Sequence, residues 1–228
     1  MLLSLDRKFI FISNPKTGSS AINLFLRKVD PGLIQNGMPE GIYEQKIITG
    51  KDEHIRPRHL KVKMGSYFDE FQIFTFVRSP YERTVSVYFF YKNGKPINHR
   101  NNKRLFFSLA NICLARLLPF SIYSLIKPIR PNRDYVLDNE SNFIVNFIGR
   151  TNYFDRDLCL IMKEFGIVLG AVPLTKINAS SHDSEYDKYY SSPVHRYLFN
   201  LKFKDEIKLF NFLKDKPANF DWKGIRFS

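Results

Sequence analysis

Residues 9–20, FIFISNPKTGSS, decide the fold. The short, unbroken apolar run FIFI predicts a buried strand over 9–13. Asn14 and Pro15 end that strand, and the apolar spacing of AINLFLRKV then predicts a helix over 19–29. A strand, a small polar loop and a helix in this order suit the binding of an anion, because the first amides of a helix have no partner inside it.

The position of the Lys in this loop is unusual. The common nucleotide-binding loop, GxxxxGK[ST], has its Lys directly after the second Gly. Here Lys16 comes two residues before Gly18, which is the only Gly of the loop. Either the loop holds no anion, or it holds a different anion from the usual nucleotide loop.

Composition narrows the classes of partner. At 228 residues with 44% hydrophobic content, the chain suits one folded domain over 1–228, and disorder is excluded. Its net charge of +13 favours an anionic partner such as phosphate, sulfate, nucleic acid, an acidic glycan or a membrane surface. Cys113 and Cys159 lie in apolar runs, so we expect neither a disulfide framework nor a zinc site of thiolates alone. MLLSLDRKF is too short in apolar residues for a signal peptide, and we expect a cytoplasmic protein.

The remaining pattern predicts an α/β fold, a mainly parallel sheet flanked by helices on both faces. Two strands, 9–13 and 71–77, end in polar loops at Asn14 and Arg78. Both loops should therefore lie at the same edge of the sheet, where ligands of such folds bind. Weaker strands are expected at 143–148 and 168–174, and helices at 19–29, 56–64, 80–92, 105–125, 153–165 and 193–214.

The second loop has its own signals, in FTFVRSPYERTVSVYFFY. Ser79 and Glu82 can form a capping box around Pro80, which predicts a helix start. Arg78 precedes this helix and Ser86 lies about two turns into it, and an Arg with a hydroxyl suits a phosphate dianion. A purely structural use of both side chains stays open at this point.

These motifs resemble a known family. PKTGSS after a strand, followed by FVRSPYERTVSVY, resembles the two donor-binding motifs of sulfotransferases that use 3′-phosphoadenosine 5′-phosphosulfate. HIRPRHLKVKMG, FIVNFIGRTNYFDRDL and KINASSH resemble segments of the carbohydrate sulfotransferase branch, in a bacterial-type member. The resemblance implies the sulfotransferase variant of the P-loop-containing nucleoside triphosphate hydrolase-like fold. It does not cover 98–130, which we interpret as an insertion or as a helical segment that contacts a membrane or substrate.

The resemblance implies a role for each matching residue. The first loop would hold the 5′-phosphosulfate, and Lys16 would stabilise charge on the bridging oxygen as the S–O bond breaks. Arg78 and Ser86 would hold the 3′-phosphate. Arg150 matches an Arg that bears on the cofactor or on the surroundings of the base, but Asn152 stands where the family has a Glu, so the ion pair of that Glu is lost. The donor-binding set is Lys16, Thr17, Gly18, Ser19, Ser20, Arg78, Ser86 and Arg150.

His54 falls at the position of the family's catalytic base, since a neutral imidazole can take the proton of an alcohol. His59 is the alternative base. Substrate contacts are expected from His59, Asn178, Ser181 and His182. We expect a glycan or glycolipid acceptor and no nucleic acid. We also expect no metal, because the strand at 71–77 carries no Asp that could anchor magnesium.

Two other classes stay open. A nucleotide kinase would explain the strand, loop and helix but not the position of Lys16, and a basic polyanion-binding module would explain the net charge. The apolar stretch 105–130 is interrupted by Arg116 and Pro119, so a buried helical pair, an interfacial helix at the inner face of the membrane and a spanning helix are all considered.

Overall fold

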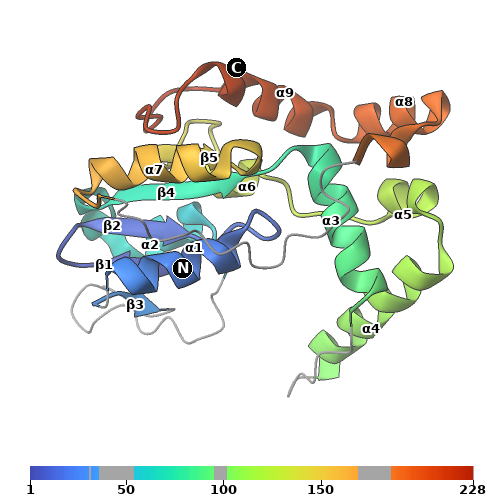
Figure 1. Cartoon of the computed structure of the whole chain (residues 1–228), viewed down its shortest axis with the longest axis horizontal. Helices are drawn as coiled ribbons and strands as arrows, with labels where there is room; N and C mark the ends of the chain where they lie inside the picture. The colour runs from blue at the N-terminus through green and yellow to red at the C-terminus, as the bar shows by residue number, and fades with distance from the viewer. Residues whose placement is uncertain (31, 36–53, 95–101, 169–185, 228) are drawn as a thin grey trace. The chain divides into compact units, whose positions relative to one another are not determined.

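The computed structural model describes residues 1–30, 32–35, 54–94, 102–168 and 186–227 (Figure 1). These residues form two compact units, each built from separate stretches of the chain. The predicted insertion over 98–130 falls in the second unit. The first unit comprises Met1–Arg78, Pro131–Asn178 and Leu209–Ser228, and the second comprises Ser79–Arg130 and Ala179–Lys208.

The first unit is built on a mixed five-stranded sheet in the order β3-β1-β2-β4-β5. The central strand pairs, β2 with β4 and β4 with β5, are parallel, as the sequence predicts. β1, for which the sequence gives no strand signal, pairs antiparallel with both β2 and β3, so the sheet is mixed instead of mainly parallel. The strands are β1 (Leu2–Ser4), β2 (Phe9–Ile12), β3 (Ile34–Gln35), β4 (Gln72–Val77) and β5 (Phe147–Arg150).

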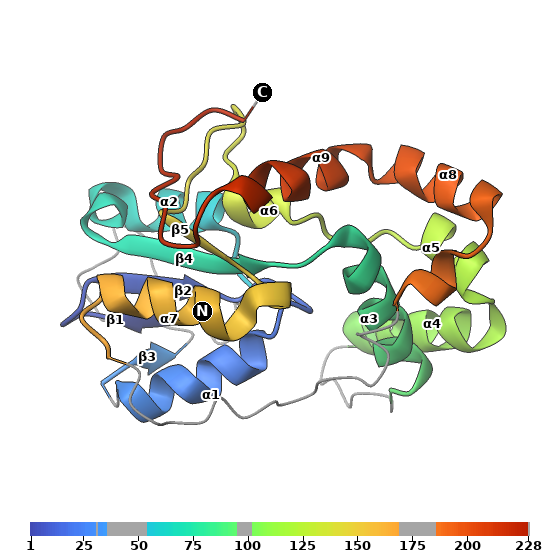
Figure 2. The same ribbon diagram turned by 45° about the horizontal axis from the view of Figure 1, so that its top comes forward.

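Both faces of the sheet are buried, because neighbouring residues of a strand point to opposite faces. Phe9 and Phe11 pack against α1 (Ser19–Val29) and α7 (Phe154–Glu164). Ile10 and Ile12 belong to a second core with α2 (Pro57–Met64) on the other face (Figure 2). The unbroken apolar run FIFI, from which the strand was predicted, reflects this burial on both sides.

The predicted strand at 143–148 is wrong in its boundaries. The backbone of Phe143 accepts from Gly224 and donates to Ile225, and Asn146 accepts from Trp222, so these residues pair with the C-terminal segment. Regular pairing with β4 begins only at Phe147. Of the strand predicted at 168–174, Val168 is not in a strand, and 169–174 lie outside the described residues.

The second unit is helical, with a core that includes Val85, Tyr88, Tyr123, Tyr190 and Phe199. The predicted helix over 105–125 is two helices, because Pro119 has no N–H to continue the first one. The predicted helix over 193–214 also divides, at Phe203, where the sequence has neither Pro nor Gly. The helices are α3 (Pro80–Lys92), α4 (Asn102–Leu117), α5 (Phe120–Ile126), η3 (Tyr186–Tyr190), α8 (Pro193–Lys202) and α9 (Lys204–Phe212), which ends in the first unit.

Short elements complete the first unit: η1 (Gly65–Glu70), α6 (Arg133–Val136), η2 (Thr151–Tyr153) and η4 (Leu213–Asp215). No helix among the described residues is long and apolar enough to cross a membrane.

Candidate functional site

The first loop, residues 13–20, turns sharply into α1 at Gly18. Gly18 is the N-cap residue, with a φ of 77°, and no side chain caps the helix. A Cβ at this position would lie 2.9 Å from Cε2 of Phe154. Both the backbone conformation and the neighbouring ring therefore require Gly. Within the first turn of α1, the backbone N–H groups of Ala21 and Ile22 donate to the carbonyl oxygen of Gly18 at 3.0 and 3.2 Å.

The hydroxyl groups of the first loop stabilise the loop itself. Thr17 Oγ1 donates to the carbonyl oxygen of Asn14 at 2.8 Å, and Ser19 Oγ donates to the same oxygen at 2.7 Å. Thr17 is fully buried, whereas Ser20 is exposed. Thr17 and Ser19 thus fix the path of the loop through their hydroxyl groups, and their predicted contacts with the donor stay a prediction.

Lys16 has a left-handed backbone conformation, with a φ of 66°. Such a φ is uncommon for a residue other than Gly, and it is found at sites where the surroundings hold the backbone in place. One such contact is a hydrogen bond of 3.4 Å from Nη1 of Arg78 to the carbonyl oxygen of Lys16. The two predicted loops therefore meet at the same edge of the sheet.

Two buried Asn side chains connect the loops further. Asn14 Nδ2 donates to the carbonyl oxygen of Phe76 at 3.0 Å and to Oδ1 of Asn132 at 3.1 Å. Asn132 Nδ2 donates in turn to the carbonyl oxygen of Arg78 at 2.9 Å. Sequence reasoning missed Asn132, because it lies in an irregular stretch, PIRPNRD, with no motif to mark it.

The ring of His54 lies at the start of the first loop. Its Nδ1 atom is 2.8 Å from the carbonyl oxygen of Ser13. A carbonyl oxygen only accepts hydrogen bonds, so Nδ1 carries the proton and Nε2 of the neutral ring keeps a free electron pair. The predicted base is thus held in the tautomer that a base requires, by a backbone group that no sequence pattern could identify.

His59, the alternative base, lies in α2, which begins at Pro57. Partial burial lowers the pKa of His59, and the positive charges of Arg58 and Arg56 lower it further. The ring therefore favours the neutral form, as a base must, but it is five residues beyond His54 along the chain. The structure thus gives His54 the direct contact with the first loop.

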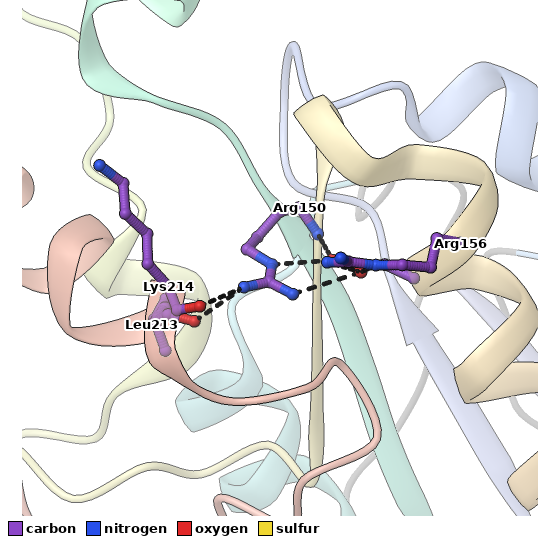
Figure 3. A network of polar contacts seen from close by, with 5 residues as sticks. Arg150, Arg156, Leu213 and Lys214 are labelled. Carbon is purple, nitrogen blue, oxygen red and sulfur yellow. Dashed lines mark hydrogen bonds and ion pairs between the residues drawn. The ribbon is translucent and has the colours of Figure 1, made fainter.

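Arg150 lies at the end of β5 in a buried network of hydrogen bonds (Figure 3). Its Nε donates to Asp157 at 2.8 Å, and its Nη2 donates to the same carboxylate at 3.3 Å. Its Nη1 donates to the carbonyl oxygens of Leu213 and Lys214 at 3.2 and 2.9 Å. These contacts give the guanidinium a structural role, joining β5, α7 and the C-terminal segment, and its predicted contact with the donor stays a prediction.

Asp157 is the carboxylate that pairs with Arg150, and the sequence analysis did not identify it. It also accepts hydrogen bonds from the Arg150 backbone at 3.0 Å and from two nitrogens of Arg156, at 3.1 and 2.9 Å. The side chain of Asp157 is fully buried. The spacing GRxxxxxRD alone does not predict the pairing of Arg150 with Asp157, because that pairing depends on α7 packing against β5.

The roles of the other predicted site residues stay predictions. Ser86 is buried in α3 and belongs to the second unit, so its convergence with Arg78 on one phosphate stays a prediction. Ser79 stands at the N-cap of α3, but its side chain makes no capping hydrogen bond, so the predicted capping box is not formed. Asn178, Ser181 and His182 lie outside the described residues.

No group of three or more His, Cys, Asp and Glu side chains among the described residues is arranged to hold a metal ion. Comparison of the chain with protein-family models, with curated proteins and with solved structures finds no match.

Proposed function

We propose that this protein is a sulfotransferase that moves a sulfuryl group from 3′-phosphoadenosine 5′-phosphosulfate to a hydroxyl of a glycan or glycolipid. The observation that carries the proposal is the placement of His54 at the first loop. Its Nδ1 lies 2.8 Å from the carbonyl oxygen of Ser13, and Lys16 follows three residues later in the same loop. An oriented base and a cation at one helix N-terminus are the parts that transfer to a hydroxyl needs.

The donor would bind across the two loops that meet at the edge of the sheet. The backbone N–H groups at the start of α1 and the ammonium group of Lys16 would hold the 5′-phosphosulfate. Arg78, which contacts the carbonyl oxygen of Lys16, would provide the fork of N–H donors for the 3′-phosphate. Arg150 is the remaining predicted donor contact, and its guanidinium also lies in the buried network with Asp157, Leu213 and Lys214.

The proposed reaction is a direct in-line transfer. The acceptor oxygen forms a bond to sulfur while the bond from sulfur to the bridging phosphate oxygen breaks. Nε2 of His54 takes the proton of the acceptor hydroxyl, and the leaving group is adenosine 3′,5′-bisphosphate. Lys16 stabilises the negative charge that grows on the bridging oxygen, so its contribution is greatest in the transition state.

Titration calorimetry tests the donor class first. A sulfotransferase binds adenosine 3′,5′-bisphosphate without a metal and more tightly than ATP with Mg²⁺. Preference for ATP with Mg²⁺ would support a kinase, and binding of heparin alone, with a steep dependence on salt, would support a polyanion-binding module. Transfer of radiolabelled sulfate from the donor to a panel of glycolipids and glycans then tests the reaction itself, and transfer to none of them would contradict the proposed acceptor class.

A further inference from the structure

Helix α4 is apolar on its exposed side. Ser108, Ile112 and Ala115 form the stripe of this helix that is buried. The exposed large side chains include Phe106 at 69%, Phe107 at 67% and Leu117 at 80%. On a helix, Phe106 and Leu117 lie on one side, together with Ala110, Cys113 and Leu114. From Phe106 to Leu117, the outward face of α4 therefore carries no charged residue along its centre.

Such a face differs from that of an ordinary surface helix, which is polar on the side facing water. Arg116 fixes α4 within its unit, since its Nε donates to the carbonyl oxygen of Lys92 at 3.2 Å and its Nη2 to that of Gly94 at 3.1 Å. The apolar face is thus part of an anchored helix. A contiguous exposed apolar face of this kind marks a surface that contacts something other than water.

The stretch of chain that contains α4 has charges of a single sign. Between Glu82 and Asp134 the chain contains no Asp or Glu. Two basic residues, Lys103 and Arg104, belong to the first turn of α4 itself. An apolar helix face in a stretch with only positive charges matches an anionic lipid surface, where apolar side chains enter the acyl boundary and basic ones meet phosphate headgroups. The basic residues of the stretch are Arg83, Lys92, Lys95, Arg100, Lys103, Arg104, Arg116, Lys127, Arg130 and Arg133.

We propose that α4 docks the second unit on an anionic lipid membrane, lying in the plane of its surface. The helix has 16 residues, a length of about 24 Å at about 1.5 Å per residue. The hydrocarbon core of a bilayer is about 30 Å thick. A helix of this length that carries Lys103, Arg104 and Arg116 rests at the interface, with Phe106, Phe107 and Leu117 inserted.

A second copy of the chain fits this face less well. Two copies joined through the same face would bring the same basic stretches together, with no acidic residue of the stretch to offset them. α8 shows the contrast, because it also exposes apolar residues, with Tyr197 at 64% and Leu201 at 57%. Acidic residues stand close to α8 in the chain, among them Asp187, Asp205 and Glu206. We therefore assign lipid binding to the exposed face of α4 and use α8 as the control.

Docking on the membrane does not require the donor or the acceptor. If the protein is the proposed sulfotransferase, docking also has a consequence for its acceptor. An enzyme held at a lipid surface meets acceptors presented by that surface. The acceptor class is then a lipid-linked glycan, and a free oligosaccharide of the same structure should be a poorer acceptor.

Flotation of the full-length protein with vesicles tests the docking directly. One set of vesicles contains phosphatidylcholine alone, and the other contains equal parts of phosphatidylcholine and phosphatidylglycerol. We expect binding to the anionic vesicles only, weakened by added salt. Leu117→Ser and Phe106→Ser should each weaken binding about tenfold, and Lys103→Gln about fivefold.

Tyr197→Ser on α8 is the matched control, because it removes a large side chain of the same unit that is 64% exposed, close to the 69% of Phe106, and it should leave binding unchanged. Circular dichroism of each variant checks that the helices are intact. The proposal is overturned if both vesicle types bind equally, if neither binds, or if Tyr197→Ser weakens binding as much as Leu117→Ser. It is also overturned if sedimentation shows a dimer that Leu117→Ser dissociates. Because flotation uses no donor, its failure is distinct from a failure to bind adenosine 3′,5′-bisphosphate.

Discussion

Nδ1 of His54 lies 2.8 Å from the carbonyl oxygen of Ser13, which ties the ring to the loop that precedes α1. An Asn at position 54 can keep this hydrogen bond through its amide N–H but has no counterpart of Nε2. We therefore expect His54→Asn to keep the fold and the affinity for adenosine 3′,5′-bisphosphate, while turnover falls by about two to four powers of ten. Turnover and calorimetric affinity, measured side by side, check this prediction.

His59→Ala is the control for His54, because His59 lies in the adjacent helix α2 and its pKa is lowered by burial and by the neighbouring Arg58 and Arg56. It should change turnover only a few-fold. If His59→Ala abolished activity and His54→Asn did not, the base would be His59, and the match of this segment to the sulfotransferase pattern would fail.

Lys16→Ala should lower turnover far more than it lowers donor affinity. A charge that acts mainly on the departing oxygen contributes about two to three powers of ten to the rate. Lys8→Ala is a matched control, since Lys8 also has a positive φ, of 52°, but precedes β2 at its other end. Equal turnover in the two variants would show that Lys16 does not stabilise the leaving group.

Arg78→Ala should weaken adenosine 3′,5′-bisphosphate by about 1.5–3 kcal/mol, the range for a hydrogen bond to a charged group. Affinity for adenosine 5′-phosphosulfate, which has no 3′-phosphate, should barely change. Calorimetry with both ligands measures the difference. Equal losses for both would mean that Arg78 acts through its contact with the carbonyl oxygen of Lys16 alone.

Asp157→Asn should destabilise the first unit by about 3–5 kcal/mol, because it leaves the guanidinium of Arg150 buried without its counter-charge. Urea unfolding followed by the fluorescence of Trp222, the only Trp, reports on this unit. Glu70→Gln is the control, since it removes an exposed ion pair with Lys8 in the same unit and should change stability by less than about 1 kcal/mol. A loss of similar size in both variants would contradict the structural role of the network.

His195 makes the second unit sensitive to acid. Burial lowers the pKa of His195 below its ordinary value of 6.5, and a hydrogen bond with the backbone of Tyr189 acts in the opposite direction. The unfolded chain therefore binds more protons as the pH falls below 6.5, so this contribution to stability is present above that pH and is lost below it.

Nε2 of His195 lies 2.7 Å from Oγ of Ser124 in the unit's interior, and a Gln amide can occupy a similar position without titrating. His195→Gln should flatten the pH dependence of the stability of this unit. Hydrogen exchange of α5 and α8 amides at about pH 7.5 and about pH 5.5 measures it. An unchanged slope would assign the acid sensitivity to other groups.

The sequence predicted the helices whose first residues are marked by a nearby Gly or Pro. The helices beginning at Ser19 and Pro80 have the predicted bounds, because Gly18 and Pro80 mark their starts directly. The contacts that complete the site come from residues distant in sequence, such as Asn132 with Arg78 and Arg150 with Leu213. No local signal encodes such pairs, so the sequence predicted His54 and Lys16 as candidates but not the groups that orient them.

The segment Leu209–Ser228 belongs to the first unit, although most of that unit precedes it by many residues. During synthesis on the ribosome, Arg150 and Asp157 therefore emerge well before Leu213 and Lys214, whose carbonyl oxygens complete the network. The core on one face of the sheet also includes Leu209 and Trp222, which are synthesised later than most of its other members. The nascent chain therefore cannot complete this core until it has been extended as far as Trp222, and a chain released before that point would expose the core to chaperones and proteases.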